Sequence, residues 1–189
     1  MRFNGYSFKN LNFINFTMDF ENKESRTLFF RYAAPCGKVF VKRGVIDRAY
    51  FNSLIDAVAR NEIPEGAEKT FEFALKMCDN VAQNLQKRKI DEEVVREYFW
   101  IVHDRTARQR YKKFHDFDLD ECIVYPGKVL SDIANKKALV STPIKNVNYR
   151  ADFVPELKKG DDVTVHYDFI AEVIPEKDAK ILWKLKDKK

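Results

Sequence analysis

Cysteine and histidine are both scarce in this chain, with three of each among 189 residues. The cysteines are Cys36, Cys78 and Cys122, an odd and sparse set that does not support the disulfide framework of a small secreted domain. No stretch approaches the roughly 18–20 apolar residues that a membrane-spanning helix needs. The N-terminal stretch shows neither the apolar run nor the cleavage site of a secretory signal. We therefore expect a soluble protein of the reducing cytoplasm, without a membrane partner.

The sequence also lacks the short motifs of the common enzyme classes. It contains no G-x-S-x-G elbow, no phosphate-binding P-loop, no H-E-x-x-H zinc motif and no C-x-x-C pair. A nucleophilic pair of Cys122 with His166 is the one catalytic arrangement that the residues suggest. We therefore expect an accessory or binding protein rather than an enzyme.

Apolar and aromatic residues, by contrast, are plentiful. Hydrophobic residues make up 45% of the chain and include 16 Phe, which is enough for a packed core without disulfides. Basic residues outnumber acidic ones by only 34 to 29, for a net charge of +5 and a pI near 9.0. This excess permits a nucleic-acid partner but is too small to indicate one.

The first 118 residues predict a mostly helical domain. Ser7 is placed to cap a short helix, and a second helix is expected over residues 24–34, where Pro35 stops it. A turn and a short extended piece around Val39 and Val41 should follow.

Three further helices show apolar stripes with helical spacing, and Asp47 and Asp91 are placed to cap the first and the third. The stripe of the second helix includes Cys78, which is therefore expected in the core. The stripes are Phe51, Leu54, Ile55 and Val58; Phe71, Ala74, Leu75, Cys78, Val81, Ala82 and Leu85; and Val94, Val95, Tyr98, Phe99 and Val102.

From about residue 119 the pattern changes to short apolar runs separated by Pro, Gly and Asn. The runs CIVYPGKV, KALVSTPI, NYRADFV and DDVTVHYDFIAEVI predict a small antiparallel β-barrel or sandwich over residues 119–189. A short helix from about Pro175 to Leu185 is expected to close it. The fold class is therefore α+β, with a helical domain over residues 1–118 and a β domain after it.

His166 stands in the last of these runs. Strand alternation puts Val163, Val165, Tyr167 and Phe169 on one face, which we assign to the core. His166 then lies on the opposite face with Thr164 and Asp168, and we expect it to point outward. An ordinary surface histidine is the alternative to a functional one.

Cys122 is expected to open the first strand of the same domain. A lone cysteine at a strand edge is commonly a buried structural residue. A thiolate and an imidazole on one small barrel, however, form a soft ligand pair for iron, zinc or copper. Two ligands do not complete a metal site, so the metal would be shared with a partner protein or a small ligand.

The segment around Cys122 resembles the start of the HypC/HupF hydrogenase-maturation chaperones, which begin Cys-x-x-x-Pro-Gly followed by a basic residue and Val. That family later has Gly-Asp-x-Val-x-Val-His, then a Phe and an Ile before the last helix. The resemblance covers about residues 122–185. The matching residues are Cys122, Pro126, Gly127, Gly160, Asp161, Val163, Val165, His166, Phe169 and Ile174.

The resemblance implies a small OB-like barrel that helps to assemble the Fe(CN)₂CO unit of nickel–iron hydrogenases. The implied partners are a HypD-like maturation protein and the hydrogenase large-subunit precursor. Carried over by motif, Cys122 contacts the iron and binds the partner, and His166 assists at the same iron. Pro126 and Gly127 would shape the turn that presents the thiol.

Two features depart from the family pattern. The cysteine is internal here, whereas family members carry it near a free N-terminus. Asp168 stands where the family has Gly between His and Phe, and its carboxylate is a possible accessory group that orients the imidazole or ligates metal. Cys36, in a loop between Pro35 and Gly37, is a second possible metal or redox group.

A nucleic-acid-binding protein is the alternative reading. The end of the predicted helix that starts at Asp91 is basic and also carries Tyr111 and Phe114, so it can form a stripe that contacts phosphates. The pattern Gly-Asp-x-Val-x-Val also occurs at the start of OB and SH3-like barrels of RNA-binding proteins. A solvated helix face explains the same residues. The candidate nucleic-acid contacts are Arg105, Arg108, Lys112 and Lys113.

Overall fold

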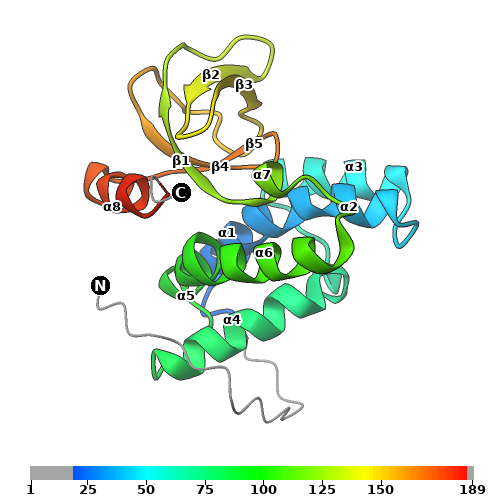
Figure 1. The fold of residues 1–189 in the computed structure, drawn as a ribbon. Helices are drawn as coiled ribbons and strands as arrows, with labels where there is room; N and C mark the ends of the chain where they lie inside the picture. The colour runs from blue at the N-terminus through cyan, green and yellow to red at the C-terminus, as the bar shows by residue number, and fades with distance from the viewer. Residues whose placement is uncertain (1–18, 187–189) are drawn as a thin grey trace.

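The computed structural model describes residues 19–186, so the short helix expected after Ser7 lies outside the described residues. The chain forms a layer of helices and, above it, a small closed sheet with a C-terminal helix beside it (Figure 1). The mixed α+β class and the C-terminal helix predicted from the sequence are therefore confirmed.

The helical layer is built from the first part of the chain. Asp47 and Asp91 accept hydrogen bonds from backbone N–H groups at the starts of two helices, as predicted. The helices are α1 (Lys23–Ala33), α2 (Gly37–Lys42), α3 (Arg48–Ala59), α4 (Glu72–Asn84), α5 (Glu92–Glu97), α6 (His103–Phe114) and α7 (Leu119–Cys122), with short 3₁₀ turns at Ala34–Cys36 and Ala67–Phe71.

The segment expected to be extended around Val39 and Val41 is helical instead. It forms α2, which follows α1 after the turn that holds Pro35 and Cys36. Val39 packs against the core of the sheet and Val41 against the core of the helices. Two apolar positions two residues apart therefore serve two cores on different sides of one helix, a tertiary effect that overrides the strand preference of valine.

The last of the predicted helices is interrupted. A π-helical turn, Tyr98–Val102, lies between α5 and α6, and the N–H of His103 donates to the Tyr98 carbonyl, five residues back. A π turn inserts one extra residue into the helical register, and such turns are frequent at functional sites. Side chains after Val102 consequently face directions that a continuous α-helix would not give them.

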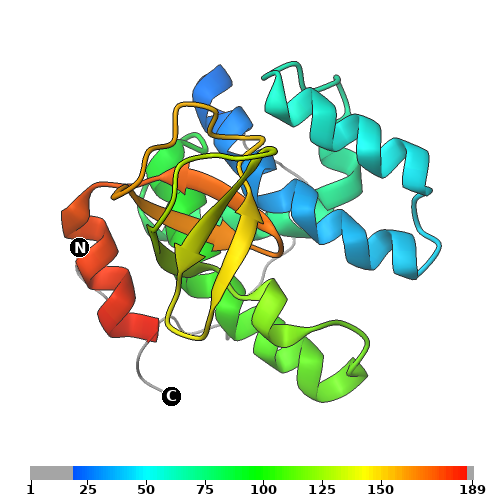
Figure 2. The same cartoon turned by 90° about the horizontal axis from the view of Figure 1, so that it is seen from above.

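The sheet closes on itself in the strand order β1-β2-β3-β5-β4. Neighbouring strands pair antiparallel, as predicted, except β3 and β5, which are parallel. The strands are β1 (Tyr125–Val129), β2 (Lys137–Ser141), β3 (Asn146–Arg150), β4 (Asp162–His166) and β5 (Phe169–Val173), followed by the helix α8 (Glu176–Lys186). Seen from above, the sheet lies between α8 and α3 (Figure 2).

A shared hydrophobic core joins the sheet to the helices. Val163 and Val165 are buried in the core of the sheet as predicted, whereas Tyr167 is buried in the turn after β4, against Cys36 and Cys122, and Phe169 belongs to the shared core. The reason is the tight turn at Tyr167, which has a φ of 54° and reverses the chain before Phe169. The outer surface of β4 and β5 is thus covered by helices. Between residues 19 and 186, none of the helices has both the length and the apolar character to cross a bilayer.

Candidate metal-binding site between the helices and the sheet

His166 lies on the outer face of β4, but this face is not exposed to solvent. The prediction that His166 points outward into solvent is therefore wrong, since its side chain is fully buried (0% exposed). Thr164, two residues earlier on the same face, is buried too and its hydroxyl lies 2.6 Å from that of Tyr32. Strand alternation identified the face correctly, but the α1–α2 segment covers it, which a local sequence pattern cannot reveal.

The orientation of the His166 ring is set by the end of α1. Its Nδ1 lies 2.8 Å from the backbone carbonyl oxygen of Tyr32. Because a carbonyl can only accept, Nδ1 carries the proton and the lone pair is on Nε2. Burial lowers the pKa of His166 to about 4, so the ring is neutral near pH 7. A neutral imidazole held through one nitrogen by a carbonyl is the usual arrangement of a metal-ligating histidine.

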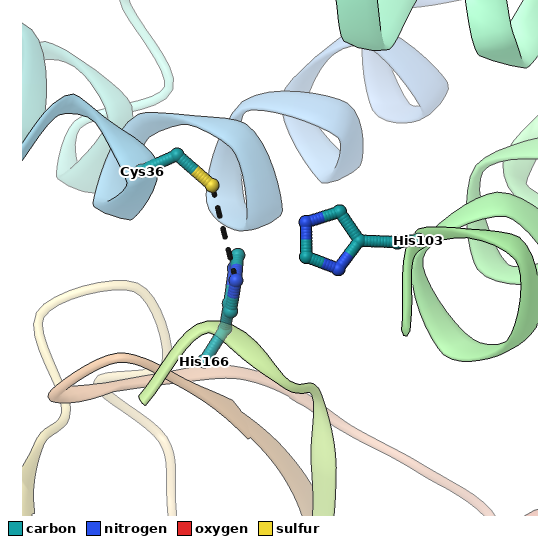
Figure 3. Close-up of side chains that lie close together, drawn as sticks. All are labelled: Cys36, His103 and His166. Atoms are coloured by element: carbon teal, nitrogen blue, oxygen red, sulfur yellow. Dashed lines mark hydrogen bonds between the residues drawn. The ribbon is translucent and has the colours of Figure 1, made fainter. Parts of the chain in front are cut away.

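The thiol of Cys36 faces that lone pair. Its Sγ lies 3.8 Å from His166 Nε2, and the two side chains approach each other from α1–α2 and from β4 (Figure 3). Burial raises the pKa of the Cys36 thiol well above its usual value of 9.0. The sulfur is therefore a thiol in the metal-free protein, where it can donate weakly to the ring nitrogen.

His103 brings a second imidazole to the same place. It is the first residue of α6, directly after the π turn, and it is 8% exposed. Its ring centroid lies 5.2 Å from that of His166. Burial lowers the pKa of His103 well below 6.5, and the nearby His166 acts in the same direction. Its buried Nδ1 has no hydrogen-bond partner among the described residues, and a buried polar atom in that state calls for a ligand, ion or water.

Together these three residues form a compact set of soft donors. One donor atom from each of Cys36, His103 and His166 lies within 4.8 Å of the other two, and the side chains converge from three separate elements (Figure 3). Tetrahedral bonds of about 2.3 Å to sulfur and about 2.0 Å to nitrogen separate the two donor atoms by about 3.5 Å. The 3.8 Å between Cys36 Sγ and His166 Nε2 is close to that spacing.

Cys122 stands next to this set. It ends α7 instead of opening β1, and its Sγ lies 3.9 Å from His103 Nε2. Burial raises the pKa of its thiol to about 11, and the residue is 7% exposed. The structure therefore brings the two motif residues Cys122 and His166 to one cluster, with His103 between them.

A buried polar network supports the main chain that holds His166. The Tyr32 hydroxyl donates to Glu172 at 2.5 Å and accepts from Trp100 Nε1 at 2.8 Å. Arg96 in turn pairs with Glu172 at 2.8 Å. Tyr32 is thereby anchored through its side chain to β5 and to the π turn, and its carbonyl stays aimed at His166.

A small apolar cavity reaches the cluster from the surface. Its volume is about 100 Å³, and Cys36, His103 and Cys122 form part of its wall. Phe73 also lines it and is 51% exposed, so the cavity extends to solvent. The donors are thus buried but accessible through this opening.

The remaining residues implied by the family resemblance lie elsewhere. The Asp168 side chain is 39% exposed and pairs with Lys38 at 2.7 Å, while the Tyr32 carbonyl orients the imidazole. Pro126 and Gly127 lie inside β1 opposite Thr164 and Val163, so the expected turn that presents the thiol is not there. Gly127 is needed for close approach, since a Cβ would collide with Val140 and lie 3.2 Å from the Ser141 carbonyl.

The basic residues proposed to contact nucleic acid are on α6, beyond His103. Arg105, Arg108, Lys112 and Lys113 are exposed. Lys113 lies with its ammonium 5.1 Å from the Phe114 ring. These side chains form a solvent-facing part of the helix and contribute no donor to the cluster.

His103 is the cluster residue that the sequence pattern missed. Because His103 follows Val102 in the apolar stripe of its helix, the sequence pattern predicts a residue that packs at an interface and not a ligand. The sequence did offer one indication of the site, the small number of histidines and cysteines, because two of only three histidines and two of only three cysteines lie close together here.

No family model, no curated protein and no solved structure matches this chain.

Proposed function

We propose that this protein binds a soft transition-metal ion at Cys36, His103 and His166, with Cys122 as an additional thiol donor. The observation that carries the proposal is the fixed ring of His166, whose Nδ1 is committed to the Tyr32 carbonyl and whose Nε2 faces Cys36 at 3.8 Å. Mixed imidazole and thiolate donors favour zinc, iron or copper over magnesium and calcium.

The resemblance to the HypC/HupF chaperones makes iron the proposed cargo, carried as an accessory protein of hydrogenase maturation. Two observations support this choice. The five-stranded closed sheet followed by a helix is compatible with the OB-like barrel that the resemblance implies, and Cys122 and His166 both contact His103. Cys122 is buried, unlike a cysteine at a free chain end, so in this proposal iron or a partner reaches its thiol through the cavity.

Anaerobic titration with Fe(II), Zn(II) and Co(II) tests the metal site. We expect one ion per chain, and losses of more than about 100-fold in affinity for Cys36→Ser and His166→Asn, since losing a group that only hydrogen-bonds a metal ligand already costs about 10–100-fold. Cys78→Ala is the matched control, because Cys78 is a buried cysteine of the helical core. Equal affinity in the control and both ligand variants contradicts the proposal.

The maturation role has its own test. The iron-loaded protein is mixed with a purified HypD-like maturation protein, and complex formation is measured by size-exclusion chromatography. We expect a complex that is weakened in Cys122→Ser and unchanged in Cys78→Ala. Tight metal binding with no complex would leave the metal site standing and remove the hydrogenase-maturation role.

A further inference from the structure

We infer that the cavity beside the cluster is a binding site for a small apolar molecule that carries one terminal nitrogen or sulfur donor and coordinates the bound metal. The inference rests on the proposed metal site and adds the class of ligand that the site accepts.

The position of the cavity is the first argument. Cys36 and His103 belong to the donor set, Cys122 lies beside it with its Sγ 3.9 Å from His103 Nε2, and all three form part of the cavity wall. An ion held by these side chains lies at that wall, on the side from which a ligand can approach. Three protein donors, from Cys36, His103 and His166, lie within 4.8 Å of one another, and a tetrahedral site with three protein ligands keeps its fourth position for an exogenous ligand.

The chemistry of the wall is the second argument. Phe71, Phe99 and Ala107 give it apolar and aromatic surface, and Thr106 adds a hydroxyl. Two arginines also line it: the guanidinium of Arg43 is paired with Asp116 at 2.6 Å, and that of Arg110 lies over the Phe73 ring, 5.9 Å from its centroid. Ligand sites are mostly apolar with few polar groups, so this wall suits an apolar body rather than a charged one.

The volume sets the size of the ligand. An apolar cavity of about 150 Å³ holds benzene, so a cavity of about 100 Å³ with an opening to solvent accepts no more than one small ring. Pyridine, with six ring atoms and one donor nitrogen, is a suitable probe. A biaryl such as 4-phenylpyridine exceeds the available space.

The experiment titrates the Co(II)-loaded protein with pyridine and follows the visible absorption bands of cobalt. We expect a saturable spectral change with pyridine and at least tenfold weaker binding of 4-phenylpyridine. Ala107→Leu on α6 and Ala74→Leu on α4 fill the cavity from two sides, and each should weaken pyridine at least tenfold while Co(II) still binds. Ala134→Leu, at an exposed position, is the matched control and should behave as wild type.

The outcomes are distinguishable. A protein that binds one Co(II) but shows no spectral change with pyridine overturns the inference and leaves the proposed function intact. Equal pyridine binding by both cavity-filling variants and the control also overturns it, because the ligand would then enter elsewhere. Failure of Co(II) itself to bind overturns both.

Discussion

The Nδ1–H of His166 donates to the backbone carbonyl of Tyr32 at 2.8 Å, so a strand of the sheet and the end of a helix hold one imidazole between them. This contact links the two layers at the cluster. It also fixes the tautomer that leaves Nε2 available to a metal.

The Tyr32 hydroxyl should be important for stability. Tyr32→Phe leaves the buried groups of Glu172, Thr164 and Trp100 with one partner fewer each, so we expect a loss of about 1–3 kcal/mol in the free energy of unfolding. Urea denaturation measures it. Tyr50→Phe is the control, because the Tyr50 hydroxyl bonds Thr70 at an exposed position. Equal losses in the free energy of unfolding for the two substitutions would show that the buried network stabilises the fold no more than an exposed hydrogen bond does.

Metal affinity should rise with pH. The thiols of Cys36 and Cys122 have raised pKa values, about 11 for Cys122, and each must lose its proton to become a thiolate ligand. The His166 pKa of about 4 keeps the ring neutral between pH 6 and 8. Over that range we expect about a tenfold gain in affinity per pH unit for each ligating thiol. Competition titrations at several pH values should show the slope falling by one in Cys36→Ser.

The metal-free protein should lose stability in acid through His166. The unfolded ring takes up a proton near pH 6.5 but the native ring only near pH 4, so stability falls as pH drops through this window. The shift corresponds to about 3 kcal/mol. Comparing wild type with His166→Asn by denaturation at pH 7 and pH 4 isolates this share. His115→Asn, the same substitution at an exposed helix end outside the cluster, is the matched control.

Gly127 should resist substitution for a packing reason. In Gly127→Ala the new methyl meets the Val140 side chain across the sheet, and we expect a loss of about 1–3 kcal/mol from overpacking. Thermal or urea unfolding measures it. In a Val140→Ala background the same change should cost less. A cost that does not depend on residue 140 would place the effect in the backbone instead.

The exposed basic residues of α6 allow a test of the nucleic-acid alternative. If they contact phosphates, binding of a single-stranded oligonucleotide should weaken steeply with salt and fall further in Arg108→Glu with Lys112→Glu. The proposed metal site does not require oligonucleotide binding by α6. Binding that is absent or insensitive to salt removes the alternative, whereas a steep salt dependence gives α6 a role separate from the cluster.

Much of the secondary structure follows from local rules in the sequence. Asp47 and Asp91 start helices because their carboxylates accept from backbone N–H groups of the first turn. The short apolar runs after residue 122 became strands, since alternation and turn residues act over a few positions. The prediction of an extended piece around Val39 was wrong because Val39 and Val41 pack against two different cores, and such tertiary packing is not visible in the local pattern.

The candidate site was only half visible in the sequence. The motif resemblance pointed to Cys122 and His166, which both lie at the cluster. His103 was missed because a π turn changes its direction, and the contact of Cys36 with His166 joins the 3₁₀ turn after α1 to the end of β4, which are 130 positions apart. Contacts between residues more than a hundred positions apart leave no local pattern.

By itself, the sequence determined most of the helices and strands, the α+β class, and which face of β4 carries His166. Only the tertiary structure decided that helices cover this face and that Cys36 and His103 meet His166 there. The physical reason is that periodicity tells which side chains share a face, whereas what covers that face depends on how apolar surfaces distant in the chain are buried together.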